Sequence, residues 1–326
     1  MRRLSLRPVR SCGLFVLCLA AVASVGAPTG ASGATAPAYV TPLIAHTAWT
    51  ATENCQPVTG VVGLPGVLSG HAGRGFTVTG TLVTSWIKST ARNCIENLAL
   101  SPFPKPIQLP SWADLAGLRT TYPSFDLTSA SVDYKELTTL TTTQQKAEAC
   151  NSEATIVSHG VTAPLPLFAY PNNKFTTTMN SMIRSQCHYV LGRRYSGAAN
   201  TPSTVTSGFL NVFSINGGHC TDTTLPCFGL STRFPYTASL ALAKLFHPAA
   251  GTWVVPQFYR LVTGTKSSGR LQWNCLGAAS SHYTFDTGGD STELYCANDY
   301  YAALANQPSY VVKNLNIRQV EKLWGL

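Results

Sequence analysis

The chain has 326 residues, of which 44% are hydrophobic and only 11% are charged, against about 25% charged in an average soluble domain. This length suffices for one large domain, and the low charge excludes a long charged tail and a coiled coil. The net charge of +9 includes Arg2, Arg3, Arg7 and Arg10. Removing these four from the 23 basic residues leaves 19 against 14 acidic ones, a net charge of about +5. No Lys/Arg-rich stripe remains, so we expect no binding to nucleic acid.

The N-terminal segment predicts export. Its four arginines precede an apolar run over residues 13–25, and small residues continue to Ala38, which is the layout of a secretory signal peptide. We assign residues 1–38 to a signal peptide and short leader, and residues 39–326 to a single domain. The apolar run is short for a membrane span, and no later stretch reaches about 20 apolar residues. We therefore expect a secreted monomer without a membrane anchor.

The first half of the domain predicts loops, then one strand and one helix. Residues 39–75 are rich in Gly, Pro and Thr with little periodicity, which is typical of loops. Residues 76–84 alternate apolar and small polar side chains, which predicts a strand. Four prolines between residues 102 and 110 predict an extended connection. Residues 142–160 predict a helix capped by Thr142, whose buried face carries Ala147, Cys150, Ala154 and Val157.

The second half predicts alternating strands and helices. Apolar runs predict strands, and longer periodic segments between turn signals predict helices. The expected strands are 165–170, 188–192, 252–262 and 310–312, and the expected helices are 174–186, a segment near 291–304, and 317–324. This alternation indicates an α/β domain built on a parallel sheet, either open or closed into a barrel.

The cysteines predict disulfides. Eight follow the leader, namely Cys55, Cys94, Cys150, Cys187, Cys220, Cys227, Cys275 and Cys296. An even number in an exported chain favours four disulfides, although eight cysteines allow 105 connectivities. Zinc is the alternative, but even the closest pair is spaced more widely than zinc ligands usually are. We expect a local Cys220–Cys227 pair, a Cys275–Cys296 pair, and then Cys55–Cys94 and Cys150–Cys187.

Three segments resemble one family in their order and spacing: Trp112–Leu115 (WADL), Ser129–Thr138 (SASVDYKELT) and Phe168–Asn173 (FAYPNN). They are similar to the corresponding segments of polysaccharide deacetylases, the carbohydrate esterase family 4. The resemblance extends over roughly residues 76–326. It implies a distorted (β/α) barrel, here stapled by disulfides, with its site at the C-terminal ends of the strands.

The same resemblance implies that the zinc site of this family is lost. Its first motif, T-F-D-D-G, supplies a base and a metal ligand, and its counterpart here is Thr50–Asn54, with Thr52 and Glu53 in place of the aspartates. Its second motif, H-[ST]-x-x-H, supplies two zinc-binding histidines, which Ala130 and Tyr134 replace. A methyl group and a phenol cannot substitute for two imidazoles on zinc. We therefore expect no metal and no cofactor, and zinc only if the protein is an active enzyme after all.

The remaining family motifs are also altered. The third, R-x-P-[YF]-G, corresponds to residues 169–173 and keeps only its proline, and Tyr259 takes the place of the histidine that acts as general acid. The chain thus resembles hydrolases of carbon–nitrogen bonds but has the features of a pseudoenzyme. In the geometry that the resemblance implies, a groove for polysaccharide is lined by Asp133, Tyr134, Tyr170, Asn172, Asn173 and Tyr259.

Other sites are weaker hypotheses. His46 and Glu53 can form a replacement metal site if Asp126 or Asp133 lies opposite. Among the other histidines, we expect His159 to end a helix and His71 to lie in a solvated loop. The segment 284–288 (TFDTG) resembles the family's first motif, but only 38 residues follow it. No G-x-S-x-G element of a serine hydrolase is present.

These observations favour a secreted protein that lacks metal-dependent deacetylation and retains a groove for a polysaccharide or another cell-envelope glycan. The alternative is an active hydrolase that removes N- or O-acetyl groups through a rearranged site. A purely structural secreted protein is a third hypothesis.

Overall fold

The computed structural model describes residues 36–53, 55–57, 61–95, 107–196, 198–214, 248–258, 260–262, 294–296 and 312–326. Residues Ala36–Leu326 belong to one unit, and its first strand, β1 (Ala38–Val40), begins at the last residue of the expected leader. None of the helices in the described residues has the length and hydropathy to span a bilayer.

The centre of the fold is a closed barrel of seven strands, all parallel to their neighbours. Its strands are short and deeply buried, because parallel strands in a barrel are covered on both faces. In order around the barrel they are β10 (Leu165–Phe168), β11 (Tyr189–Tyr195), β12 (Phe209–Ser214), β14 (Pro256–Phe258), β2 (Leu43–Ile44), β6 (Thr79–Leu82) and β9 (Asp126–Ser129). The predicted parallel barrel is thus confirmed.

A second parallel sheet leads into the barrel. It has the order β13-β1-β17, in which β13 is Trp253–Val254 and β17 is Val312–Asn314. The chain passes from β1 into β2 and from β13 into β14, so two segments cross from this outer sheet into the barrel. The expected strand over residues 252–262 is therefore three short strands, of which the last is β15 (Arg260–Val262).

Two smaller sheets lie outside the barrel. One has the order β4-β3-β8-β7 and is antiparallel throughout, and the other has the order β16-β15-β5. Their strands are β3 (Thr50–Glu53), β4 (Gln56–Pro57), β7 (Asn93–Ile95), β8 (Ile107–Leu109), β5 (Val61–Val62) and β16 (Leu294–Cys296). The helix expected near residues 291–304 is wrong where the structure describes it, because residues 294–296 form β16.

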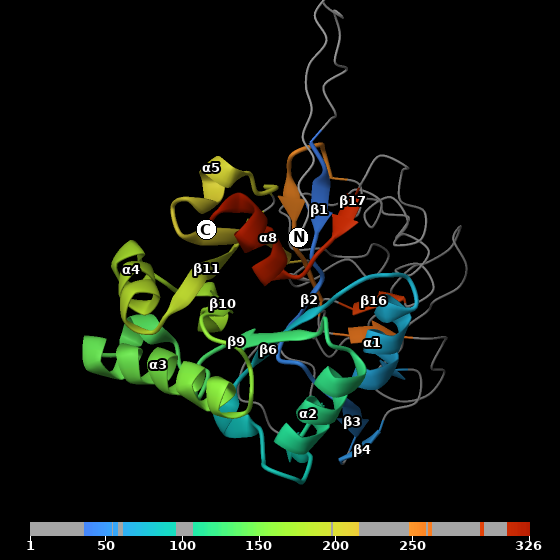
Figure 1. The fold of residues 1–326 in the computed structure, drawn as a ribbon. Coiled ribbons are helices and arrows are strands. Elements are labelled where there is room, and N and C mark those ends of the chain that lie inside the picture. Colours follow the sequence, from blue (N-terminus) through green and yellow to red (C-terminus); the bar gives the residue numbers. More distant parts are fainter. Residues whose placement is uncertain are drawn as a thin grey trace, which may run out of the picture. The chain divides into compact units, whose positions relative to one another are not determined.

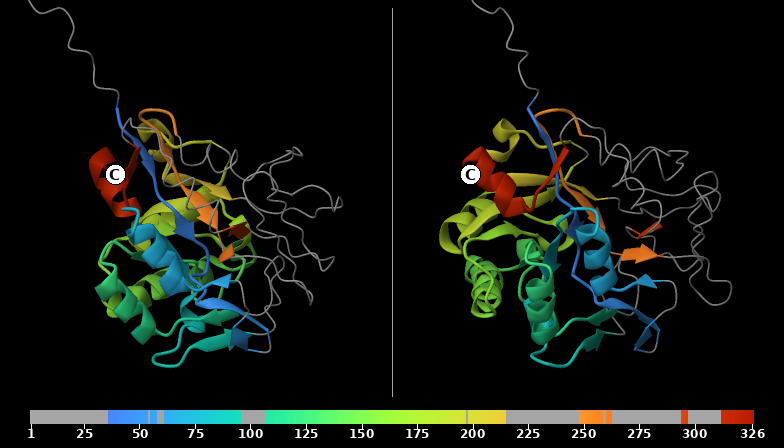
Figure 2. Two further views of the ribbon diagram at one scale, coloured as in Figure 1. Left: turned by 90° about the vertical axis from the view of Figure 1, so that its right-hand side faces the viewer. Right: turned by 45° about the vertical axis from the view of Figure 1, so that its right-hand side comes forward.

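Helices cover the outside of the barrel, as Figures 1 and 2 show. The longest, α3, packs against β9 and against the next helix, α4, which in turn packs against β11. The α-helices of the described residues are α1 (Leu64–Ala72), α2 (Trp112–Thr121), α3 (Thr142–Ser158), α4 (Thr177–Gln186), α5 (Pro202–Val205) and α8 (Ile317–Trp324).

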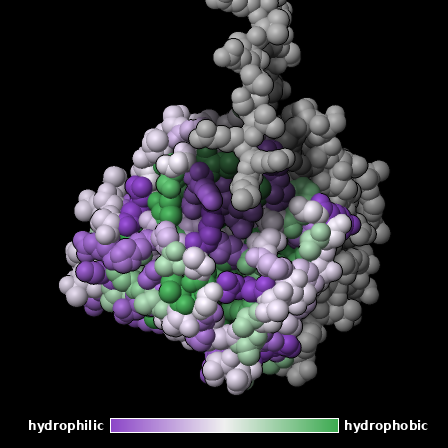
Figure 3. Space-filling view, viewed as in Figure 1, coloured by the Kyte–Doolittle hydropathy of each residue, from purple (hydrophilic) through white to green (hydrophobic). Residues whose placement is uncertain are grey.

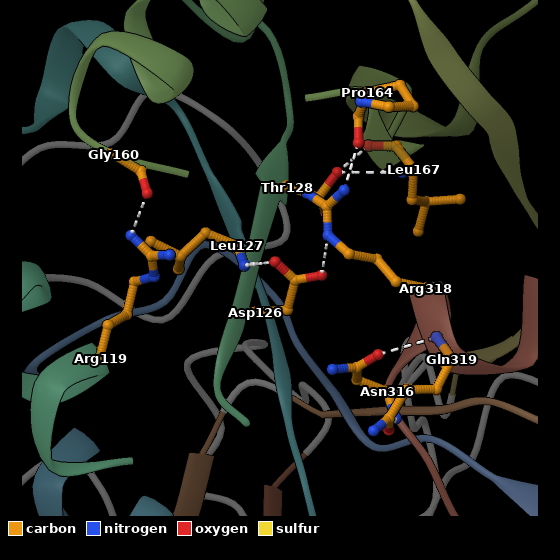
Figure 4. A network of polar contacts seen from close by, with 10 residues as sticks. All are labelled: Arg119, Asp126, Leu127, Thr128, Gly160, Pro164, Leu167, Asn316, Arg318 and Gln319. Atoms are coloured by element: carbon orange, nitrogen blue, oxygen red, sulfur yellow. Dashed lines mark hydrogen bonds and ion pairs between the residues drawn. The ribbon is translucent and has the colours of Figure 1, made fainter. Parts of the chain in front are cut away.

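Helix α8 closes the N-terminal end of the barrel. Its Ile317 and Val320 pack into the same apolar cluster as Leu43, Leu167 and Leu191 of the barrel strands. Arg318 donates to Asp126 Oδ2 at 2.6 Å, at the start of β9, and also bonds the carbonyl of Pro164, directly before β10 (Figure 4). Hydrophilic side chains gather over α8 and β17 on the visible face (Figure 3). The helix is therefore amphipathic, with its apolar side toward the barrel.

Three predictions about helices need correction. The segment 39–75 was expected to be loops, but it contains α1, whose buried residues Leu64, Val67, Leu68 and His71 follow the i, i+3, i+4, i+7 spacing of a helix. His71 is thus buried rather than solvated, and its Nδ1 lies 2.7 Å from the carbonyl of Val67. Glycines and a proline in this segment concealed the periodicity.

The other two corrections concern the N-cap and the buried face of helix α3. Its N-cap is Thr141, which forms a capping box with Gln144, and the expected cap Thr142 is the first helical residue. Its buried face was also predicted wrongly: Ala147 and Ala154 are exposed. The buried residues are Glu148, Ala149, Ser152 and Ile156, because the small and polar side chains of this face pack against β9. His159 ends the helix, as expected.

Two of the expected disulfides are present. Cys55 bonds to Cys94, and Cys150 of α3 bonds to Cys187 directly after α4. Cys220, Cys227 and Cys275 lie outside the described residues. For Cys296, on β16, only the backbone is described.

Candidate functional site

The C-terminal ends of the barrel strands bring together six polar or aromatic side chains, which we call the barrel mouth. Each comes from a barrel strand or from the turn directly after one. They are His46 after β2, Trp86 after β6, Tyr134 after β9, Arg193 and Tyr195 on β11, and Gln257 on β14. Sites in (β/α) barrels form at this end because the loops that follow the strands converge there.

Three rings of the barrel mouth contact one another. The ring centroids of His46 and Tyr134 are 4.7 Å apart in an edge-to-face arrangement, and Trp86 lies 5.9 Å from His46 and 5.8 Å from Tyr134. His46 and Tyr134 have positive φ angles of 54° and 60°, a conformation that residues other than glycine rarely adopt. The turns after β2 and β9 thus hold these two rings against each other at a cost in backbone strain.

The charge of His46 is set by its surroundings. Burial, together with the positive charge of Arg193, lowers the pKa of His46 to about 3. The imidazole is therefore neutral at physiological pH. Among the described residues of the barrel mouth, Arg193 consequently carries the one buried positive charge.

Arg193 is the centre of a second group of contacts. Its Nη1 donates to Gln257 Oε1 at 3.0 Å, and its Nη2 donates to the carbonyl of Tyr170 at 2.8 Å. The guanidinium lies over the ring of Tyr195, 4.4 Å from its centroid, and Gln257 Nε2 donates to the hydroxyl of Tyr195 at 2.8 Å. These contacts fix the guanidinium inside the barrel, and only 3% of Arg193 is exposed.

The predicted groove residues are only partly brought together at this end. Tyr134 belongs to the barrel mouth. The backbone N–H of Asn172 lies 3.5 Å from the hydroxyl of Tyr134, and Asn173 Oδ1 accepts a hydrogen bond from the N–H of Tyr195 at 3.1 Å. Asn172 is exposed and Asn173 is half-buried, so the backbone of Asn172 and the side-chain amide of Asn173 border the mouth.

The other predicted groove residues lie elsewhere. Tyr170 is fully buried, and its hydroxyl donates to Asn180 Oδ1 at 2.8 Å. Its ring is thus part of the core, and burial raises the pKa of its phenol. Asp133 is on the surface, 2.7 Å from Lys135 Nζ, which lowers the pKa of the carboxyl. Tyr259 lies outside the described residues.

The expected position of the first family motif needs correction. Thr52 and Glu53 lie on β3, which pairs antiparallel with β4 and β8 outside the barrel. The first barrel strand is β2, so the residue that occupies the end of this strand is His46. In the sequence, only a short apolar segment precedes His46, and this segment is too short to distinguish a strand from a loop.

The described residues do not form a zinc site. No three His, Cys, Asp or Glu residues within the described ranges are grouped so that they can hold a metal ion. Ala130 offers a methyl group and Tyr134 a phenol at the positions predicted to correspond to zinc-binding histidines, and His46 is a single imidazole. Asp126, considered as a partner of His46, is bound to Arg318 at the opposite end of the barrel. This donor set does not fit zinc, which takes at least three protein ligands in catalytic sites.

Sequence reasoning did not find Trp86, Arg193, Tyr195 and Gln257. Arg193 and Tyr195 come at the end of an apolar strand and have the composition of an ordinary exposed terminus. Gln257 lies between a proline and a phenylalanine in a strand expected to be apolar throughout. Because side chains alternate between the two faces of a strand, the sequence could have placed these residues inside the barrel. This would have required knowing where β11 and β14 begin and end.

No family model matches this chain, and no curated protein matches it. Among solved structures, the Streptococcus pyogenes deacetylase PplD, in complex with acetate, aligns with a TM-score of 0.32 and 13% sequence identity. The alignment covers 54% of this chain and 90% of that one.

Proposed function

We propose that this protein is an exported carbohydrate-binding protein whose barrel mouth binds a cell-envelope polysaccharide without metal-dependent deacetylation. On the basis of the motif resemblance, we propose that it has the fold of the polysaccharide deacetylases.

The observation that carries the proposal is the composition of the barrel mouth. Trp86 and Tyr195 are half-buried, and the amide of Asn173 lies beside Tyr195 and accepts a hydrogen bond from its backbone N–H. Aromatic faces pack against the C–H groups of sugar rings, while hydroxyl and amide groups supply directional hydrogen bonds. This combination of aromatic rings and an amide is better suited to binding a saccharide than a polyphosphate metabolite.

We propose that the protein does not hydrolyse its ligand, because the side chains at the barrel mouth do not fit a zinc ion. A catalytic zinc supplies a water of lowered pKa, and the residues at the motif positions do not fit zinc. Export is proposed from the N-terminal layout and is supported by the two disulfides, since disulfides persist mainly in oxidising compartments.

The test is binding of the mature protein to an immobilised panel of neutral and acidic oligosaccharides, including acetylated chito-oligosaccharides. Trp86→Ala should weaken binding to the best member about tenfold, the scale of one lost stacking contact of 1–1.5 kcal/mol. The matched control is Trp324→Ala, which removes a half-buried tryptophan on α8 at the opposite end of the barrel.

Released acetate should be measured on the same acetylated oligosaccharides. Binding without acetate release supports the proposal. Catalytic acetate release would replace it with the hydrolase alternative, and the lack of binding to every member would refute the carbohydrate-binding function.

A further inference from the structure

The barrel mouth contains a buried cation, Arg193, whose hydrogen-bond acceptors among the described residues are neutral. Both acceptors of Arg193, the amide of Gln257 and the carbonyl of Tyr170, are uncharged. No carboxylate of the described residues lies within 4 Å of its guanidinium. Buried arginines are normally paired with an anion, because removing the charge from water is otherwise unfavourable.

One donor of this cation is also unused. The Nε–H of Arg193 is buried and has no hydrogen-bond acceptor within the described part of the chain. Nearly all buried donors in proteins are satisfied. The unused donor and the unbalanced charge are separate observations, and both indicate that an acceptor with a negative charge completes this site.

The guanidinium faces the inside of the barrel. Leu191, two residues earlier on β11, packs with Leu43 and Leu167 in the barrel interior, and residues two apart on a strand point to the same face. Arg193 therefore forms the next layer above these leucines, at the C-terminal end. Its charge reaches the other side of the mouth, since it helps to lower the pKa of His46.

We propose that Arg193 is the carboxylate subsite of the barrel mouth and that the bound saccharide is acidic, with its carboxylate accepting the hydrogen bond from Nε–H. This inference rests on the proposed carbohydrate-binding function. A carboxylate is planar and carries one charge, so it matches the flat guanidinium and balances its single charge. The half-buried Tyr195 ring lies over the guanidinium, so the ligand displaces this ring as it binds.

The adjacent Arg194 provides a matched control. It lies on the same strand and carries the same charge, but its Nε already donates to Asn211 Oδ1 at 2.6 Å, and its guanidinium lies near the ring of Phe209. Replacing either arginine by glutamine changes the net charge equally. Only Arg193→Gln removes the cation that faces the barrel interior.

The experiment is calorimetric titration with an oligogalacturonate and with its fully methyl-esterified form, in which each carboxylate is converted into an uncharged methyl ester. We expect the wild type to bind the acidic form at least about tenfold more tightly, as for a charge-assisted hydrogen bond. Arg193→Gln should remove this preference, and Arg194→Gln should keep it within about twofold. Melting curves of both variants show whether they fold.

The outcomes separate this inference from the proposed function. Equal binding of the acidic and esterified forms by the wild type would overturn the carboxylate subsite while leaving carbohydrate binding intact. No binding of either form, or of any panel oligosaccharide, would refute the proposed function itself. If Arg193→Gln does not fold, Arg193→Lys replaces it: this variant keeps the charge but loses the planar donor, and an undiminished acid preference in it would overturn the role of the guanidinium.

Discussion

The side chain at position 134 affects whether the barrel mouth can bind a metal ion. The ring of Tyr134 contacts His46 and Trp86, at the position where the family resemblance predicts that a zinc-binding histidine is replaced. His46 has the neutral imidazole that a metal ligand needs, because its pKa is lowered to about 3. Among the described residues, no group of three His, Cys, Asp or Glu can hold a metal ion with it, and Ala130 and Tyr134 are the two positions predicted from the resemblance to have lost a ligand.

This leads to a prediction about zinc. Wild-type protein should bind zinc no better than a generic protein surface does. Ala130→His with Tyr134→His should bind zinc at least about tenfold more tightly, since three imidazoles are then available with His46. Calorimetric zinc titration measures the gain.

The control adds His46→Gln to the double variant, which should abolish the gain. Tight stoichiometric zinc in the wild type would contradict the loss of the metal site. No gain in the double variant would show that residues 130 and 134 do not face a common point with His46.

At the scale of elements, α8 combines clear sequence signals with one buried acid. Asn316 and Gln319 form a capping box at its start, and Gly325, with φ of 68°, ends it, as is typical of helix termini. Glu321 is only 5% exposed, and its Oε1 has no hydrogen-bond partner within the described residues. Burial raises the pKa of this carboxyl well above its ordinary value of 4.5.

Glu321 should therefore make the protein less stable as the pH rises. The folded state keeps a proton that the unfolded state releases above pH 4.5, so the folded state loses relative stability as the pH rises from 4.5 toward the raised pKa of the folded state. Glu321→Gln should raise the free energy of unfolding at pH 7 by about 1–3 kcal/mol and flatten its dependence on pH.

Thermal melts at pH 5 and pH 8 measure this effect. The control is Glu153→Gln on α3, a half-buried acid for which we expect no change. A lower melting temperature for Glu321→Gln at pH 8 would show that Glu321 is charged and stabilising in the folded protein.

At the scale of the whole molecule, the disulfides join elements that the barrel already brings together. Cys150–Cys187 links the middle of α3 to the end of α4, and Cys55–Cys94 links the turn between β3 and β4 to β7 of the outer antiparallel sheet. The sequence separations are 37 and 39 residues. Cross-links of this span restrict the unfolded chain, and each typically contributes about 2–4 kcal/mol.

The mature protein should accordingly contain no free thiol, and reduction should lower its melting temperature markedly. Thiol labelling of the denatured, unreduced protein tests the first part, and melting with and without reductant tests the second. Incorporation of two or more labels would contradict the expectation of four disulfides. A Cys150→Ser, Cys187→Ser double variant measures the contribution of one known link.

The sequence by itself determined the features that depend on neighbouring residues. The helix over residues 317–324 has an amphipathic period between its caps Asn316 and Gly325. Residues 76–84 alternate apolar and small polar side chains, and residues 165–168 form a short apolar run, so these elements were recognisable locally. The order of the cysteines was enough to pair Cys55 with Cys94 and Cys150 with Cys187. The parallel sheet followed from the alternation of strands and helices, whereas closure into a barrel was implied only by the family resemblance.

Only the tertiary structure decided where the site lies, because its parts are defined by pairing between distant segments. Strand β2 has two residues and no periodicity, and it becomes the first barrel strand through its pairing with β14 and β6. Trp253 Nε1 donates to Thr41 Oγ1 across 212 residues of sequence, which helps to fix this arrangement. Barrel closure then places His46 near Arg193, and no local pattern contains that proximity. Burial of His71 and Glu321 was hidden for the same reason: the surfaces that cover them come from other parts of the chain.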